Sequence, residues 1–237
     1  MLLILLLQTA APPINAEPIG EGHYRLTLAE AGALSVRNGQ ERLLPTARMI
    51  CRERPPVFGA YKYTAQTEGG PALRLEQELV CVAPDAPPAA PGEPDPLRQQ
   101  AALATSYAYF AAKDSGLYGE AYAVLSDRMK AQTPLPAWIG KAEEFAATAG
   151  APRGRRVVEI TWYDNPAGAP EPGTYVAADF SAEFANLEFA CGYLMWRVQP
   201  DGSFRLVREE QNFIDRKKRG IASLDRAPLR AQMGCKD

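Results

Sequence analysis

A proline-rich break interrupts the chain and divides it into two parts with different patterns. The segment APDAPPAAPGEPDP, residues 83–96, has recurring prolines and no apolar periodicity. Segments of this composition form stiff, extended linkers. The sequence therefore predicts an N-terminal module at residues 17–82, a linker at 83–96, a C-terminal domain at 97–215 and a polar tail at 216–237.

The C-terminal domain begins with the spacing of helices. Apolar residues recur every three or four positions in three successive segments, which predicts three helices. The first ends at Gly116, the second covers residues 118–129, and the third begins after Pro136 and ends at Gly150.

After Gly154 the pattern changes to the alternation of strands. Four strands are predicted, at residues 158–163, 175–184, 189–198 and 204–214. Helices followed by consecutive strands predict an α+β domain, with the helices packed on one face of a curved antiparallel sheet.

The N-terminal module is predicted to be small and β-rich. It has a strand at His23–Leu28, a mixed segment at residues 34–51, and a hairpin formed by residues 57–65 and 72–82. One alternating face of the second hairpin strand carries Leu73, Leu75, Leu79 and Cys81.

Four cysteines, Cys51, Cys81, Cys191 and Cys235, have no close pair of the kind that zinc ribbons and thioredoxin-like motifs need. Three pairings are open to four cysteines. The antiparallel return of the hairpin brings Cys81 beside Cys51, so we predict that disulfide. The Cys191–Cys235 disulfide follows by elimination.

The N-terminus has the layout of a signal peptide. An apolar run from Leu2 to Leu7 is followed by small residues and a cleavage point after Ala16. The run is far shorter than the roughly 20 residues of a membrane-spanning helix. The alternative is a cytosolic chain with an apolar start, but the even cysteine count favours export, and we expect a periplasmic or secreted protein.

Charge and motif content exclude several functions. The net charge of −2 gives no global field that would favour nucleic acid or an anionic membrane. The single histidine, His23, lies outside the C-terminal domain, so catalytic triads and multi-histidine metal sites are not expected. Neither GxxxxGK[ST] nor GxGxxG occurs. We expect no cofactor and no metal.

Four segments of the C-terminal domain form a recognisable pattern, and they are YFAAKDSGLYGEAYAVLS, EEFAATAGAPRGRRVVEITWY, FANLEFACGYLMW and DGSFRLVREEQNFID. Their order resembles the bacterial domain-of-unknown-function family 4019, which occurs in exported proteins. The resemblance covers about half of the chain. It implies a cone-shaped fold like that of nuclear transport factor 2, in which a curved sheet wraps a helix. It carries no catalytic residues, and one scaffold of this kind serves enzymes and binders alike.

A candidate pocket can be assembled from carboxylates and aromatic residues of the predicted sheet, namely Trp162, Asp179, Tyr193 and Glu210. Glu209 and Glu210 are adjacent in a strand, so at most one of them can face a cavity. Surface ion pairs with Arg197, Arg205 or Arg208 are the alternative that we prefer for these carboxylates.

The leading functional hypothesis is a non-enzymatic binding or interaction domain that holds a small apolar ligand, a peptide or a partner protein. The alternative is a small acid–base enzyme of the isomerase or lyase type, which would use a sheet carboxylate and a tyrosine. Self-association through the open face of the sheet, giving a homodimer, is a third hypothesis.

Overall fold

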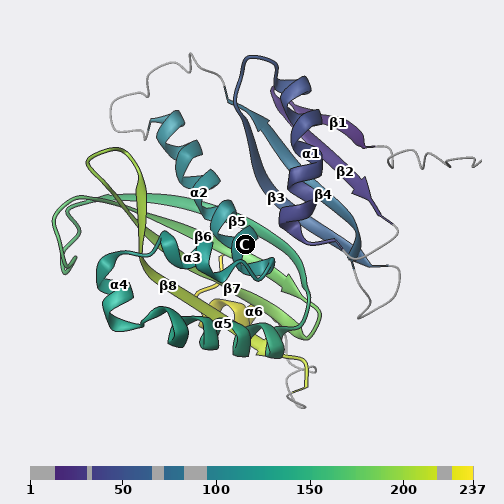
Figure 1. The fold of residues 1–237 in the computed structure, drawn as a ribbon. Helices are drawn as coiled ribbons and strands as arrows, with labels where there is room; N and C mark the ends of the chain where they lie inside the picture. The colour runs from purple at the N-terminus through teal and green to yellow at the C-terminus, as the bar shows by residue number, and fades with distance from the viewer. Residues whose placement is uncertain (1–13, 31–33, 66–71, 83–94, 218–225, 237) are drawn as a thin grey trace, which may run out of the picture.

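The computed structural model describes residues 14–30, 34–65, 72–82, 95–217 and 226–236. These residues form one open, antiparallel sheet of eight strands in the order β1-β2-β4-β3-β5-β6-β7-β8, with six helices (Figure 1). The predicted α+β class is confirmed. The proposed linker lies outside the described residues up to residue 94, and Pro96 already belongs to a helix.

The N-terminal strands are β1 (Asn15–Gly20), β2 (His23–Ala29), β3 (Pro56–Ala65) and β4 (Ala72–Cys81), and helix α1 (Val36–Cys51) packs across them (Figure 1). All six residues of β1 are exposed, and Ala16 pairs with Leu26 of β2. The predicted cleavage point after Ala16 therefore falls inside β1.

Helix α1 is the main element that the sequence prediction missed in this part. Pro45 lies inside the helix, and for this reason the sequence predicts only a mixed segment here. The side chain of Ser35 caps the N-terminus by accepting a hydrogen bond from the Asn38 amide at 3.2 Å. The buried residues nevertheless follow helical spacing, and they are Val36, Gly39, Leu43, Ala47 and Cys51. Burial of this face stabilises the helix despite its internal proline.

The predicted hairpin is present, with Val57 paired to Val80 and Tyr63 to Leu75. Leu75, Leu79 and Cys81 are buried as expected, whereas the side chain of Leu73 lies outside the described part. Gln77 is also fully buried. The chain of β3 bulges opposite it, and the Gln77 amide donates hydrogen bonds to the Gly59 and Ala60 carbonyl oxygens of that bulge.

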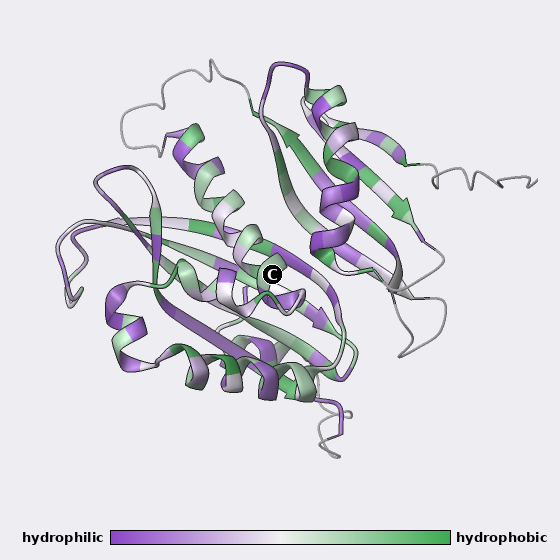
Figure 2. Cartoon of the chain, in the orientation of Figure 1, coloured by the Kyte–Doolittle hydropathy of each residue, from purple (hydrophilic) through white to green (hydrophobic). Residues whose placement is uncertain are grey.

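The C-terminal elements are α2 (Pro96–Asp114), α3 (Tyr118–Ala123), α4 (Asp127–Gln132), α5 (Leu135–Ala149), β5 (Pro152–Asp164), β6 (Thr174–Phe184), β7 (Leu187–Val198) and β8 (Phe204–Asp215). All four predicted strands are confirmed, in meander order. Apolar and polar bands alternate along many strands in Figure 2. The apolar side of β6 and β7 packs against α2 through Phe110, Phe180 and Trp196.

The single helix predicted at residues 118–129 is wrong, because the chain breaks between α3 and α4. There, Leu125 forms a parallel bridge with Leu206 on the edge of β8. The Ser126 amide donates to the Leu206 carbonyl at 2.8 Å, and the Ser126 side chain then caps α4. Pairing with the sheet edge takes the place of the helical hydrogen bonds at this point.

The two parts of the sheet are joined by a short contact between β3 and β5. Only Tyr61–Arg155 and Lys62–Gly154 pair there. Beyond them the strands separate, and the Val157 amide donates to the Tyr107 hydroxyl at 2.9 Å instead of to a strand. The buried residues of both parts still form one hydrophobic cluster.

The segment predicted as a polar tail contains helix α6 (Arg226–Gln232), which lies on the face of the sheet opposite α2–α5 (Figure 1). Asn212 of β8 donates to the Met233 carbonyl at 3.0 Å, and Arg230 lies over the ring of Phe189. The C-terminal segment therefore covers one end of this face.

Candidate functional site

A buried ion pair of the C-terminal part accepts a hydrogen bond from the N-terminal part of the molecule. The guanidinium of Arg155 in β5 donates from Nε and Nη2 to the two carboxylate oxygens of Asp114, at 3.0 and 2.8 Å. The hydroxyl of Tyr61 in β3 donates to the same carboxylate at 2.7 Å. The side chains of Arg155 and Asp114 are only 2% and 4% exposed.

The rings of Phe110, Phe180 and Phe184 surround Arg155, with their centroids 4.7 to 5.8 Å from the guanidinium carbon. This arrangement gives the cation favourable aromatic contacts in place of water. Arg155 therefore retains its charge inside the core, where Asp114 balances it.

A second buried carboxylate lies on the same side of the sheet. Glu209 in β8 accepts hydrogen bonds from the Tyr109 hydroxyl at 2.6 Å and from Lys113 Nζ at 2.7 Å. Adjacent Glu210 points to the other side, as the alternation of strand residues requires. The sequence predicts an ion pair with an arginine for these glutamates. That prediction is wrong for Glu209, which pairs with Lys113, and is confirmed for Glu210, whose carboxylate lies 2.7 Å from Arg208.

The surroundings of Glu209 keep it ionised and keep Tyr109 protonated. Burial alone would raise the pKa of Glu209, but the charge of Lys113 and the hydrogen bonds from Lys113 and Tyr109 hold that pKa below its ordinary value. Burial, together with the adjacent Glu209 charge, raises the pKa of Tyr109 well above its ordinary value. Glu209 therefore binds a proton weakly and Tyr109 holds its proton tightly, so proton transfer from Tyr109 to Glu209 is unfavourable.

Little space adjoins these buried charges. The cavity bordered by Lys113, Asp114 and Arg155 has a volume of about 80 Å³. Small-molecule sites usually enclose roughly 300 Å³ or more. The interior between the helices and the sheet is thus filled with side chains.

The four residues of the predicted candidate pocket lie on two different faces of the sheet. Asp179, Tyr193 and Glu210 are cross-strand neighbours on the face that carries α6, and the Tyr193 hydroxyl lies 3.1 Å from Glu210. Trp162 lies on the opposite face, where it contacts Phe204. These residues therefore do not line one pocket, because Trp162 falls on the other side of the pleat.

Both disulfides link the pairs that the sequence predicts. Cys51, at the end of α1, is bonded to Cys81 at the end of β4, with 5.1 Å between the Cα atoms. Cys191 in β7 is bonded to Cys235 after α6. Next to it, Lys236 Nζ contacts Asp179 at 2.9 Å and Glu159 at 2.8 Å, which joins the C-terminal segment to two strands.

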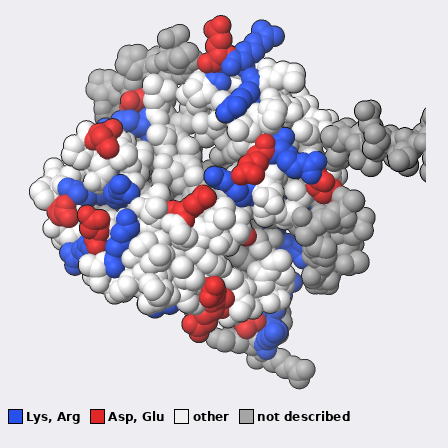
Figure 3. Space-filling model, viewed as in Figure 1, with Lys and Arg blue, Asp and Glu red and all other residues white. Residues whose placement is uncertain are grey.

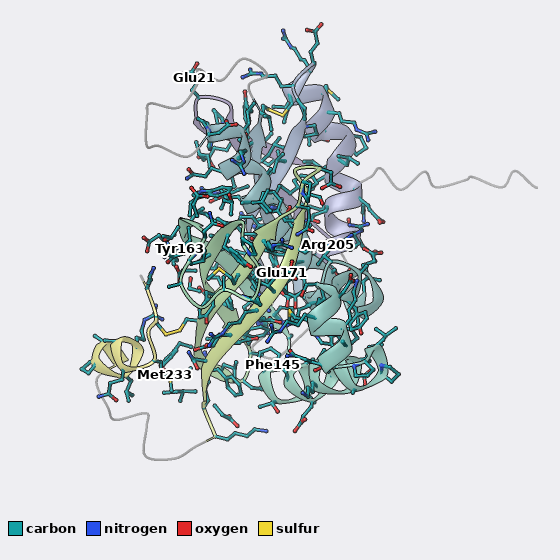
Figure 4. All side chains as sticks on the ribbon, turned by 90° about the vertical axis from the view of Figure 1, so that its left-hand side faces the viewer. Glu21, Phe145, Tyr163, Glu171, Arg205 and Met233 are labelled. Carbon is teal, nitrogen blue, oxygen red and sulfur yellow. A yellow bond between two sulfur atoms is a disulfide. The ribbon has the colours of Figure 1, made fainter. Side chains whose placement is uncertain are left out.

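A wide groove lies at the other end of the C-terminal sheet, between α4, the β5–β6 connection and the strands β7 and β8. Its volume is about 850 Å³, within the range of small-molecule sites. We call it the arginine groove after its charged lining, which comprises Arg128, Arg197, Arg205, Arg208, Asp127 and Glu171. Basic side chains, with acidic ones among them, lie beside α4 at the left-hand edge of Figure 3, and Figure 4 views this side directly, with Glu171 and Arg205 labelled.

A smaller groove, of about 340 Å³, lies where β3 and β5 separate. Four cations line it, Arg25, Lys62, Arg155 and Arg156, against Glu76, Glu78 and Glu183. Because Arg155 is buried and paired with Asp114, the remaining charges balance. The arginine groove differs because its positive charge is in excess.

Sequence reasoning identified three of the four groove arginines, but only as ion-pair partners of the sheet carboxylates. Arg128 was missed because it belongs to α4, a helix that the predicted continuous pattern concealed. Asp114 and Arg155 were missed as a pair because their positions are 41 residues apart in sequence. Periodicity within one element carries no signal for a contact of this kind.

Within the described residues, no cluster of three or more His, Cys, Asp or Glu side chains is arranged to hold a metal ion. None of the described helices is both long and apolar enough to cross a membrane. His23 is exposed at the start of β2.

Comparisons with known proteins bear on the C-terminal domain. No curated protein and no solved structure gave a significant match to the chain. A family model did match, from the middle of α2 to β8, which confirms the resemblance found in the sequence. Residues 105–208 match the family described as "Protein of unknown function (DUF4019)".

Proposed function

We propose that this chain is an exported, non-catalytic binding protein that holds its ligand in the arginine groove. The proposal rests on a contrast between the buried carboxylates and the arginine groove. The buried carboxylates are fully paired beside a cavity of about 80 Å³, whereas the groove is open and about 850 Å³ in volume. A ligand can enter the second and not the first.

Export is supported by the two disulfides. Bonds of this kind persist in the periplasm and outside the cell, and they are rare in a reducing cytosol. One ties α1 to β4, and the other ties the C-terminal segment to β7. We propose a periplasmic or secreted location on this basis.

A cone-shaped fold of the nuclear transport factor 2 type is also part of the proposal for the C-terminal domain. Helix α2 packing on a four-stranded meander supports it. In such a cone the ligand would occupy the space between helix and sheet. Here aromatic side chains occupy that space, and we therefore place the ligand at the rim of the sheet.

The enzymatic alternative has one observation in its favour. Glu209 and Tyr109 lie within hydrogen-bond distance, as general acid–base chemistry would require. Their pKa values are shifted apart in the direction that opposes proton transfer, and Lys113 occupies the other carboxylate oxygen. The pair is better suited to holding α2 against β8.

The test uses the protein released gently from the periplasm of its own host. Intact-mass analysis without reductant should find two disulfides and a shortened N-terminus, and native mass spectrometry should find a bound species. Arg205→Gln should lose that species, whereas Lys141→Gln, an exposed charge on α5 outside the groove, should retain it.

Recovery of intact protein with four free thiols and its N-terminal residues in place would refute export. Retention of the bound species by Arg205→Gln, or its absence from the unaltered protein, would refute the proposed site. Turnover of a substrate that is abolished by Glu209→Gln but not by Arg205→Gln would favour the enzymatic alternative.

A further inference from the structure

The arginine groove carries an excess of positive charge that the rest of the molecule does not share. Four arginines and two carboxylates line it, whereas the whole chain has a net charge of −2. A groove lined by one sign of charge raises the local concentration of ligands of the opposite sign. The lining therefore favours an anionic ligand over the small apolar ligand expected from the sequence.

Two of the four arginines are already neutralised by carboxylates. Arg197 Nη1 lies 2.6 Å from Glu171, and Arg208 Nη2 lies 2.7 Å from Glu210. The other two are exposed and, within the described residues, make no ion pair. Arg205 donates only to the Ala123 carbonyl at 3.0 Å, and Arg128 makes no hydrogen bond in that part of the chain.

Arg128 and Arg205 come from different elements and line the same groove. Arg128 lies in the first turn of α4, and Arg205 lies near the start of β8. The 124–126 segment hydrogen-bonds to Leu206, which fixes these two elements relative to each other. Two unpaired guanidinium groups held on a fixed frame provide a binding site for an acid group.

The pairing of Arg197 with Glu171 is incomplete. Arg197 Nη1 contacts the Glu171 carboxylate and Nη2 donates to the Pro172 carbonyl, but Nε is buried and has no partner. Arginine binds carboxylates and phosphates most strongly through two parallel N–H donors. The present contact leaves one donor of Arg197 unused, and Glu171 itself remains 57% exposed.

We propose that the arginine groove binds a small molecule with at least two acid groups, and that Glu171 occupies the place of one of them. One ligand acid group binds Arg128 and Arg205, and the second displaces Glu171 from Arg197. This inference rests on the proposed binding function and specifies its ligand. Carboxylate and phosphate groups share the required chemistry, so the probes include one of each.

The experiment measures binding of citrate and of pyrophosphate to the full disulfide-bonded chain by calorimetry at low salt. Acetate, with a single acid group, is the comparison probe. We expect citrate, pyrophosphate or both to bind at least ten-fold more tightly than acetate. Whichever of the two binds better identifies the acid group as carboxylate or phosphate.

Four variants test the roles of the individual residues. Arg128→Gln and Arg205→Gln should each weaken binding about ten-fold, the loss expected for a hydrogen bond between charged groups. Glu171→Gln should tighten binding several-fold because the competing carboxylate is removed. Glu41→Gln, which removes an exposed ion pair of α1 with Arg37, should change nothing.

Failure of both probes to bind either the unaltered chain or Glu171→Gln would overturn the inference. The proposed binding function would survive that result if native mass spectrometry showed a neutral or apolar ligand that Arg205→Gln loses. Binding that Glu171→Gln leaves unchanged or weakens would overturn the role given to Glu171. Loss of binding by Arg128→Gln would not be an effect of misfolding, since this exposed side chain makes no contact on which the described fold depends.

Discussion

Arg155 holds Asp114 through two hydrogen bonds in the core, at the one point where the two parts of the sheet meet. Asp114 is the last residue of α2, and Arg155 is paired with Tyr61 across β3 and β5. Removal of one charge leaves the other buried and unpaired, which typically costs about 3–5 kcal/mol. We expect Arg155→Leu to lower the free energy of unfolding by this amount, measured by urea denaturation.

Arg156→Leu is the matched control for that variant, because Arg156 is the next residue along the strand and is exposed. It should change stability by less than about 0.5 kcal/mol. The double variant Asp114→Leu/Arg155→Leu should recover part of the loss, since no unpaired charge remains but the buried Tyr61 hydroxyl loses its acceptor. Equal losses for Arg155→Leu and Arg156→Leu would contradict the structural role of the pair.

The Glu209 carboxylate makes stability depend on acid pH. Burial opposes its ionisation, but Lys113 and Tyr109 outweigh burial and hold the folded pKa below the ordinary value. A carboxyl group whose pKa is lower in the folded chain than in the unfolded chain stabilises the fold fully above its unfolded pKa, which is about 4.3. This stabilisation is lost as the pH falls through the folded pKa. The difference in melting temperature between the unaltered protein and Glu209→Gln should therefore be large at pH 7 and should shrink below about pH 4. Melting curves that differ by the same amount at every pH would show that Glu209 is not the titrating group.

The two disulfides should have separable effects. The Cys51–Cys81 bond closes a loop of 30 residues, and its replacement by alanines should cost about 3–4 kcal/mol of global stability. Replacement of Cys191 and Cys235 should mainly release the C-terminal segment. Limited trypsin digestion should then cut after Arg230 faster in this second variant than in the first. Equal cleavage rates in the two variants would mean that the C-terminal segment is held by its other contacts.

Two glycines provide a test of packing. A Cβ atom on Gly192 in β7 would collide with the backbone carbonyl of Glu210, so Gly192→Ala should destabilise the protein by about 1–3 kcal/mol. Gly140 lies in α5 with no atom near the corresponding position, and Gly140→Ala should stabilise the helix by up to about 1 kcal/mol. Thermal unfolding of both variants measures these changes in stability. An increase in stability by Gly192→Ala would contradict the strand geometry.

The elements that the sequence predicts well are those whose own pattern determines them. Alternation predicts β5 to β8, and the antiparallel return of the hairpin predicts the Cys51–Cys81 bond. The helix pattern failed at Leu125 because tertiary pairing with Leu206 competes with a helical turn. It failed at α1 because burial of one face outweighs the internal Pro45.

The candidate site was harder to predict because its residues meet only in the folded chain. Trp162 is predicted to share a pocket with Asp179, but Asp179 pairs with Glu159, and Trp162 lies three positions farther along β5. Side chains alternate along a strand, so an odd separation places Trp162 and Asp179 on opposite faces of the sheet. Arg128 and Glu171 enter the arginine groove from an unexpected helix and from a connection, where no periodicity applies.

The narrow pairing of β3 with β5 also has a consequence for the order in which the chain folds. Most strand contacts are between neighbours in sequence, but Lys62 pairs with Gly154, 92 positions later. Contacts between sequence neighbours form early, because closing a long loop costs entropy before any contact repays it. We expect the two hairpin-based halves to assemble first and their docking, in which the Tyr61 hydroxyl meets the Asp114 carboxylate, to be the slow kinetic step.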